Sequence, residues 1–381
     1  MAIVEFGDIV RDVKINVDRS NNPYSHYVAG DHMDSEDLTI HRCGNFATDD
    51  VGPAFTRIFK PGQILYGSRR TYLKKVAVAD FEGICANTTF VLESKDETIF
   101  DNRLLPFVML SDSFTRWSIS HSKGSTNPYV LFSDLAGYEF NLPSIEEQRV
   151  LVDKLWAAYR LKESYKKLLA ATQEMVKSQF IEMFDHVEKT KPLSDFIEVS
   201  FPGEWGQEDK DGNGVRVIRT TNFTNTGKLN LEDVVTRDID PIKAEKKRLK
   251  RGDIILERSG GTNENPVGRV VYFNEDGQFL FNNFTQLLRC KEGVNSLFIF
   301  YSLYNYYQMN KSAIRSMGNK TTGIQNLKMD QYWQIPIADV SSEQQERFVS
   351  IYHQADKSEF ELRKSIESID KVIKSLINYN A

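Results

Sequence analysis

Two long stretches with helical periodicity constrain this chain more than any other feature. They occupy residues 143–184 and 337–381, and each follows or begins with a proline. A short polar step with serine and a Glu-Gln pair comes next, Glu147-Gln148 in the first stretch and Glu343-Gln344 in the second. Ser144 with Glu147 three residues later fits a capping box at a helix start. The chain is therefore predicted to be a tandem of two similar halves, each ending in a long helix.

Shorter matches support the duplication. Leu193–Ile197 resembles Phe6–Val10, and Leu249–Leu256 resembles Phe59–Tyr66. The matching glycines Gly62 and Gly252 are 190 residues apart, and Gly124 and Gly318 are 194 apart. A repeat of this size indicates a duplicated domain, not a solenoid unit. The predicted boundaries are a first domain at 1–142, a helix at 143–184, a linker at 185–192, a second domain at 193–336 and a helix at 337–381.

Each domain alternates short apolar runs with Gly, Pro, Asn and Asp, which favours strands joined by turns. Clear strand patterns in the first domain are Ile64–Tyr66, Val76–Val78 and Thr88–Leu92. Helical patterns cover 102–120 and 298–314, and each precedes a polar loop, 121–127 or 316–322. We expect an α+β fold: two similar domains with small twisted sheets, separated by two long helices, in a pseudo-two-fold tandem duplication.

The last helix carries a seven-residue apolar repeat interrupted only by Glu359, which favours a coiled-coil partner helix. Each helix of about 40 residues would be about 60 Å long. The short linker then forces the second helix to run back along the first, giving an antiparallel pair. Alternatively, the stripe packs on its own domain. Lys162, Lys166 and Gln173 interrupt the pattern of the first helix and are candidates for partner attachment. The predicted helix-pair seam is Val152, Leu155, Tyr159, Leu169, Val176, Phe180, Phe348, Tyr352, Ala355, Leu362, Ile366, Ile369, Ile373 and Leu376.

Composition excludes several classes of protein. A hydrophobic content of 40% with 27% charged residues is ordinary for a globular protein. No apolar run is long enough for a membrane span, and no secretory signal pattern opens the sequence, so we expect a cytoplasmic protein. The three cysteines have no C-x-x-C spacing, and the histidines fit no usual zinc site, so no metal is predicted. The net charge of -5 requires any DNA-binding charge to be local.

Pro143 with Glu147-Gln148 and Pro336 with Glu343-Gln344 lead into the two long helices, and the stretches Val217–Phe223, Gly252–Leu256 and Arg258–Gly261 lie between them. The combined order of these motifs resembles the specificity (S) subunit of type I restriction-modification systems, over the whole chain. The resemblance implies two target recognition domains, each reading one half of a bipartite DNA sequence. It implies that the helices act as spacer and dock two methyltransferase (M) subunits, which bind S-adenosylmethionine, and that restriction (R) subunits join this core. The first domain has Gly67-Ser68-Arg69-Arg70 where the second has Glu257–Gly261, and residues 28–45 show no counterpart of Val217–Phe223.

An enzyme would need motifs that this sequence lacks. Asn22-Pro23-Tyr24 and Asn127-Pro128-Tyr129 have one proline each where an amino-methyltransferase loop has two, and no glycine-rich cofactor turn accompanies them. No G-x-x-x-x-G-K-[ST] sequence is present, so the ATP-driven motor is not expected here. We therefore predict a non-catalytic chain without a cofactor, and expect S-adenosylmethionine and ATP on partner subunits.

Binding chemistry then selects the candidate residues. Arg can hydrogen-bond guanine bidentately and Asn or Gln adenine, while Ser, Thr and Lys mostly contact phosphates. A coiled-coil scaffold without sequence-specific DNA binding is the competing hypothesis, and solvated loops would account for any single residue. The DNA-binding candidates are Arg69, Arg70, Tyr72, Lys74, Ser122, Lys123, Ser125 and Asn127 in the first domain, and Arg219, Asn222, Arg258, Asn263, Asn265, Arg315, Asn319, Lys320 and Thr321 in the second.

Overall fold

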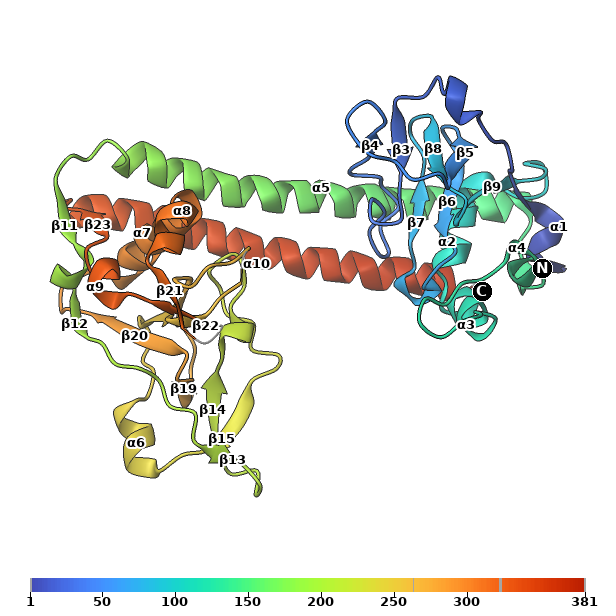
Figure 1. The fold of residues 1–381 in the computed structure, drawn as a ribbon. Coiled ribbons are helices and arrows are strands. Elements are labelled where there is room, and N and C mark those ends of the chain that lie inside the picture. Colours follow the sequence, from blue (N-terminus) through green and yellow to red (C-terminus); the bar gives the residue numbers. More distant parts are fainter. Residues whose placement is uncertain (1, 263, 322–323, 380–381) are drawn as a thin grey trace. The chain divides into compact units, whose positions relative to one another are not determined.

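The computed structural model describes residues 2–262, 264–321 and 324–379. The chain forms two compact units (Figure 1). The first unit consists of Met1–Leu169 with Glu361–Ala381, and the second of Ala170–Phe360. The boundary thus falls inside each long helix, so each unit contains part of both helices, together with one strand-rich domain. No helix in the described part of the chain is long and apolar enough to cross a membrane.

The central sheet of each unit has the same topology, as the duplication predicted. In the first unit four antiparallel strands lie in the order β2-β9-β6-β7, and in the second the order is β12-β20-β16-β18. Apolar residues fill these strands, and Ile64 and Ile254 occupy the same place in the two registers. The bounds are β2 Val10–Asp12, β6 Ile64–Gly67, β7 Val76–Val78, β9 Thr89–Ser94, β12 Ile197–Val199, β16 Ile254–Glu257, β18 Val270–Tyr272 and β20 Thr285–Cys290.

Three strands of a second four-stranded sheet also repeat, β4-β3-β8 in the first unit and β15-β14-β19 in the second, which corrects one expectation. Val217–Phe223 does have a counterpart in the first domain, because β3 pairs in parallel with β8 as β14 pairs in parallel with β19. Val28 lies opposite Cys85, and Ile218 lies opposite Phe281. The shared backbone pattern was hidden by unrelated side chains. The strands are β3 His26–Val28, β4 Gly44–Asn45, β5 Phe55–Phe59, β8 Gly83–Ala86, β13 Gln207–Glu208, β14 Val215–Ile218, β15 Val235–Asp238 and β19 Phe279–Phe281.

Each domain is closed by a two-stranded pair between its first and last strands. β1 (Ala2–Glu5) pairs with β10 (Glu139–Leu142), and β11 (Thr190–Pro192) pairs with β23 (Pro336–Ala338). The expected linker at 185–192 is therefore shorter, because its last three residues belong to β11. Short helical turns follow the first strands, α1 at Phe6–Ile9 and η4 at Leu193–Asp195.

The two predicted domain helices are each broken once. Residues 102–120 form η3 (Asn102–Leu104), α2 (Leu105–Leu110) and α3 (Asp112–Ser120). Ser111 is extended between the helices, and its hydroxyl accepts the Phe114 N–H as an N-cap. Residues 298–314 likewise belong to α7 (Ser296–Met309) and α8 (Lys311–Ser316). Other short helices are α4 Phe132–Ala136, α6 Pro241–Lys246, α9 Met329–Tyr332, η1 Arg19–Asn21, η2 Thr71–Leu73 and η5 Thr220–Asn222.

Within the polar segment expected as a loop at 316–322, residues 318–321 form a strand, and residue 322 lies outside the described residues. β21 (Gly318–Thr321) pairs with β22 (Ile324–Leu327), which also pairs with β17 (Ser259–Gly260). In the first unit only isolated bridges occupy this place, between Lys123 and Tyr129 and between Arg69 and Tyr129. The bridge register aligns Lys123 with Asn319, so the proposed match of Gly124 with Gly318 is two positions out.

The long helices are α5 (Ile145–Phe184) and α10 (Ser342–Tyr379). Ser144 and Glu147 form the predicted capping box, and Ser341 and Gln344 exchange the same bonds 197 residues later. Gln345, not Gln344, is therefore the counterpart of Gln148, and the two Glu-Gln pairs are offset by one residue. Gln148 Nε2 donates to the carbonyl five residues before it at 2.9 Å, and Gln345 does so at 3.2 Å.

Within each unit the two helices pack antiparallel. In the first unit Val152 and Leu155 share a core with Ile373, and in the second Val176 and Phe180 share one with Phe348. In each unit, residues of the strand-rich domain belong to the same core as the helices. The apolar stripe therefore packs on its own domain as well as on a partner helix. Of the predicted seam, Val152, Leu155, Tyr159, Val176, Phe180, Phe348, Ala355 and Ile373 are buried, and Leu169, Tyr352, Leu362, Ile366, Ile369 and Leu376 are partly buried.

The polar residues that interrupt the apolar pattern of the first helix form contacts within their own units. Lys162 forms an ion pair with Asp370 at 2.6 Å, and Lys166 forms one with Asp37 at 3.0 Å. Gln173 hydrogen-bonds Glu359, which is only 6% exposed. The polar groups of Lys162, Lys166 and Gln173, which were suggested as attachment points for partners, are thus engaged within their own units, and a partner bound there would have to replace these contacts.

Candidate nucleic-acid interface

Two candidate segments of the first domain, far apart in the sequence, meet in the structure. Arg69 forms a backbone bridge with Tyr129, and the Arg70 N–H donates to the Pro128 carbonyl at 2.7 Å. The hydroxyl oxygens of Thr71 and Ser122 are 3.3 Å apart. These contacts join η2 and the segment before it to the polar loop after α3. We call the exposed residues Arg69, Arg70, Tyr72, Lys123 and Tyr129 the Arg69 surface.

The backbone of this surface turns sharply at two residues that are not glycine. Arg70 and Lys74 flank η2 with φ of 50° and 48°, in the left-handed region. Such conformations cost about 1 kcal/mol or more each for residues with a Cβ, and they cluster at functional sites. The turn directs Tyr72 outward, with 54% of the residue exposed. This segment therefore exposes its side chains to solvent at the cost of local backbone strain.

The cations of the Arg69 surface and the neighbouring Lys74 differ in how free they are to bind an anion. Within the described part of the chain, the Arg69 and Arg70 guanidinium groups have no hydrogen-bond or ion-pair partner. Lys74 instead contacts Glu36 at 3.0 Å, and Lys123 contacts Asp134 at 2.8 Å. The pKa of Asp134 is lowered, chiefly by its hydrogen bond with Lys123. The two arginines are thus the better placed to bind an anion, while the lysines mainly stabilise the fold. Ser125 and Asn127 are exposed on the same loop.

The second domain places Arg258 where the first has Ser68. The Leu327 N–H donates to the Arg258 carbonyl at 2.8 Å, as the Val130 N–H donates to the Ser68 carbonyl at 3.0 Å. The Arg258 N–H donates to the carbonyl of Phe284, a residue that is 40% exposed. Asn319 of β21 lies opposite Asn326 of β22, which in turn lies opposite Ser259 of β17, the residue after Arg258. We call Arg258, Phe284 and Asn319 the Arg258 surface. Both domains thus present an arginine and an exposed aromatic residue in this region, although the residues are not counterparts, because Arg258 holds the position of Ser68 and Phe284 that of Thr88.

The other candidates of the second domain are distributed differently. Asn222 is buried and supports its own loop, because its amide accepts the Arg219 N–H and donates to two carbonyls. Arg219 contacts Asp233 at 3.0 Å. Arg315 is exposed on α8, and Asn265 is half-buried in a turn closed by Thr262. Asn263 and the side chains of Lys320 and Thr321 lie outside the described residues.

Comparison with known proteins identifies the family. The family model for the type I restriction modification DNA specificity domain matches residues 16–171 and 187–370. This chain belongs to that family. The specificity subunit of the type I restriction enzyme EcoDI from Escherichia coli is 26% identical over 167 residues, which are 44% of this chain and 36% of the relative. The matched region is thus little more than a third of that relative's length.

Solved structures of type I systems share the fold of this specificity-family chain. The S subunit from M. genitalium is 13% identical, with a TM-score of 0.57, and the match covers 99% of this chain and 94% of that one. A chain from a type I R-M system, solved to explain complex assembly and conformational transition, is 18% identical with a TM-score of 0.56, and the match covers 99% and 96%. The predicted family and fold class are therefore confirmed.

Three features near these surfaces were not found from the sequence. Tyr129 was considered only as part of a failed catalytic motif, and Phe284 carried no polar signal. A polar cavity of about 130 Å³ also lies in the second unit, lined in part by Asn265, Arg269 and Lys311. Arg269 is paired with Glu257 at 2.7 Å. The cavity depends on segments brought together by folding, so no local pattern could reveal it.

The histidine dismissed as a metal ligand does meet two carboxylates. Asp37, His41 and Glu163 place one ligand atom each within 4.8 Å of one another. Lys166 Nζ lies 3.0 Å from Asp37 and 2.8 Å from Glu163, so an ammonium group already supplies the positive charge there. The arrangement is an ion-pair network, and it gives no independent sign of a metal ion.

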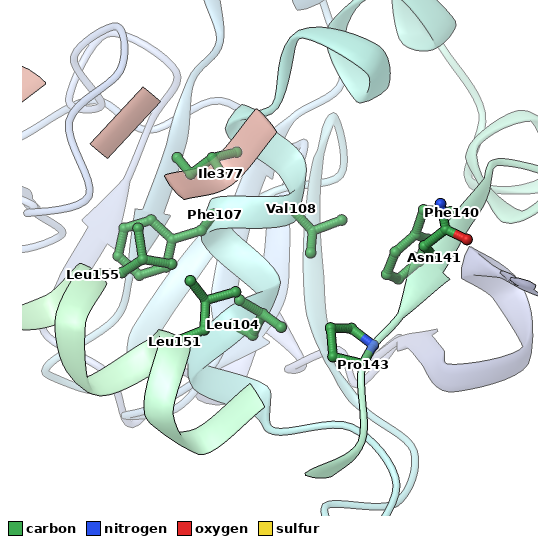
Figure 2. Close-up of a pocket in the computed structure, with 9 residues that line it drawn as sticks. All are labelled: Leu104, Phe107, Val108, Phe140, Asn141, Pro143, Leu151, Leu155 and Ile377. Carbon is green, nitrogen blue, oxygen red and sulfur yellow. The ribbon is translucent and has the colours of Figure 1, made fainter. Parts of the chain in front are cut away.

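The apolar pocket of the first unit is a packing gap between α2, β10 and the two long helices (Figure 2). Its volume is about 20 Å³, which is enough for about one water molecule. Leu104, Phe107, Leu155 and Ile377 are among the apolar side chains that line it. Neither its size nor its lining suits a cofactor.

Proposed function

We propose that this chain is the non-catalytic DNA specificity subunit of a cytoplasmic type I restriction-modification complex. Each strand-rich domain reads one half of a bipartite DNA target, and the helices α5 and α10 set the gap and dock two methyltransferase subunits. Restriction subunits complete the assembly, and S-adenosylmethionine and ATP bind to partner subunits. The observation that carries this proposal is that each domain has an arginine in backbone contact with an exposed aromatic residue, Arg69 with Tyr129 and Arg258 with Phe284.

The chemistry of these surfaces suits duplex DNA. Arginine binds a phosphate or a guanine edge through two N–H groups, and exposed aromatic rings pack on sugars and bases. The overall charge of -5 repels the DNA backbone, so unpaired arginines in restricted places would determine where contact occurs. The strained turn at Arg70 holds the Arg69 surface in one conformation, which lowers the conformational entropy lost on binding.

A half-site experiment tests the proposal. The full chain is produced with its methyltransferase subunits, and methylated sites are mapped across the genome. Arg69→Ala with Arg70→Ala should relax or abolish one half of the motif and leave the other half unchanged. Arg258→Ala should affect the opposite half. Lys60→Ala and Lys210→Ala, at exposed positions of the same domains, are the matched controls.

The outcomes are distinguishable. Methylation without a reproducible split motif would contradict the proposal, as would an equal effect of both arginine changes on both half-sites. DNA affinity of the assembled complex should also fall steeply with salt, since each phosphate contact contributes about one unit of slope. A scaffold that only gathers proteins would lack this dependence. The purified chain alone should transfer no methyl group from labelled S-adenosylmethionine to DNA.

The spacer role has its own test. Deleting one heptad from both α5 and α10 preserves the seam register and shortens each helix by about 10 Å. The unread gap between half-sites should shorten while both half-site sequences stay the same. If a half-site sequence changed while the gap stayed the same, the helices would not set the spacing, and this division of roles would be overturned.

A further inference from the structure

Each domain contacts a long helix of its own unit through a short polar segment, and the two segments are equivalent. They are Asp37–Thr39 in the first unit and Thr226–Lys228 in the second. The N–H of the last residue of β7 donates to the Leu38 carbonyl at 2.8 Å, and that of the last residue of β18 donates to the Gly227 carbonyl at 3.4 Å. Because β7 and β18 have matching registers, Thr39 and Lys228 hold the same position.

In the first unit the domain supplies a carboxylate and the helix supplies the donors. The Tyr159 hydroxyl donates to Asp37 Oδ1 at 2.6 Å, and Lys166 Nζ lies 3.0 Å from Oδ2. Tyr159 also accepts the Leu38 N–H at 2.8 Å and lies 3.1 Å from the Thr39 hydroxyl. Asp37 is 8% exposed, so this polar contact is largely shielded from water.

In the second unit the charges are reversed. Lys228 Nζ lies 2.6 Å from Asp356 Oδ1 and 2.9 Å from Glu359 Oε2. The capping-box offset places Asp356 at the position of Tyr159 and Glu359 at the position of Lys162. The domain therefore supplies a cation, and the helix supplies two carboxylates. Burial lowers the pKa of Lys228, but its hydrogen bonds with the two carboxylates raise the pKa by more than burial lowers it. The net shift is upward, so the lysine stays charged.

We infer that these opposite charges assign each strand-rich domain to its own helix. The Asp37 segment on α10 would face Asp356, Glu359 and, at the position of Lys166, Arg363, and Lys228 on α5 would face Lys162 and Lys166. Like charges in a half-buried contact are unfavourable, so repulsion as well as lost bonds disfavours the exchanged arrangement. This inference goes beyond the proposed function, because it concerns domain order and holds whether or not the chain reads DNA.

Charge reversal in the full chain tests the inference. Lys228→Glu should lower the Tm by about 4–8 °C, because three carboxylates then meet in one half-buried contact. Adding Asp356→Lys and Glu359→Lys should restore most of the loss. Lys243→Glu, on the exposed face of α6, is the matched control and should change the Tm little. If the reversed helix does not restore the Tm, complementary charge does not assign the domain.

A domain exchange provides the second measurement. Residues 2–142 and 190–338 are exchanged between the two helices, with native or with recharged helix positions, and the Tm values are compared. The recharged chain should be the more stable by a similar 4–8 °C. Equal Tm values for the two exchanged chains would overturn the inference, and if neither folds, the charge-reversal series decides. The recharging substitutions are Tyr159→Asp, Lys162→Glu, Asp356→Tyr and Glu359→Lys.

Discussion

Lys162 Nζ lies 2.6 Å from Asp370 Oδ1, and the positions 197 residues away repeat the contact as Glu359 with Gln173, at 3.4 Å. In both units α5 supplies the donor and α10 the carboxylate. Duplicated helices would be interchangeable if only their apolar stripes paired. The constant direction of this polar contact gives α5 and α10 different chemical faces, and so fixes which helix is which in the pair.

The ion pair of the first unit should contribute measurably to stability. Lys162→Met removes the charge from a position that is 12% exposed and leaves Asp370 without its partner. We expect a loss of about 1 kcal/mol in the free energy of unfolding, measured with urea. Lys154→Met, at an exposed position of α5, is the control. Adding Asp370→Leu should recover part of the loss, and strictly additive effects would show that the two groups are not coupled.

Asp37 should make stability depend on pH in the acid range. Burial raises the pKa of this carboxyl, but the hydrogen bonds from Tyr159, the Thr39 N–H and Lys166 outweigh it and lower the pKa from 3.8 to about 2. The ionised form is therefore favoured by folding, and its contribution of about 2 kcal/mol is present above pH 4 and lost as the pH falls towards 2.

Asp37→Asn is the variant that isolates this contribution. The difference in unfolding free energy between the parent and the variant should be constant above pH 4 and should shrink between pH 4 and pH 2. Urea unfolding across that range measures it. His41 and Glu163 also face this carboxylate, so His41→Gln serves as the comparison. A difference that stays constant down to pH 2 would mean that Asp37 is not held ionised by the fold.

The two helix-start glutamines should differ in importance although they are equivalent. Gln148 is fully buried, donates to the Ile99 and Pro143 carbonyls, and accepts the Asp101 N–H at 2.9 Å. Gln148→Ala leaves these groups without partners and should cost roughly 2–3 kcal/mol. Gln345→Ala breaks the hydrogen bond to the Val340 carbonyl at a half-buried position and should cost about 1 kcal/mol or less. Equal losses in thermal unfolding would contradict this ranking.

Periodicity and local signals predicted much of this fold. The apolar spacing and the Ser144 cap placed α5 within two residues of its start, and the apolar run Ile64–Tyr66 predicted strand β6. Duplication then supplied the second domain, because β6 and β16 carry similar apolar runs. These features depend on neighbours in the chain, so a sequence is enough to find them.

Features that depend on distant partners were missed. The break at Ser111 looks like any polar residue in a helical pattern, and β11 was taken for a linker because its partner β23 is far away in the sequence. Of the candidate DNA residues, Asn222 was chosen by residue type although its amide is used inside its own loop. Phe284 was not chosen, because an exposed aromatic ring looks like core in a sequence.

Arg70 allows backbone strain and DNA contact to be separated. Its φ of 50° suits glycine better than alanine, so the chain with Arg70→Gly should be about 1 kcal/mol more stable than the chain with Arg70→Ala. Both variants lack the guanidinium group, and both should lose roughly tenfold in DNA affinity when assembled with the methyltransferase subunits, with a salt slope lower by about one unit. Thermal unfolding and salt-dependent binding measure the two effects on the same proteins. If affinity followed stability, with the glycine variant binding as tightly as the parent, Arg70 would act through the turn and not through its charge.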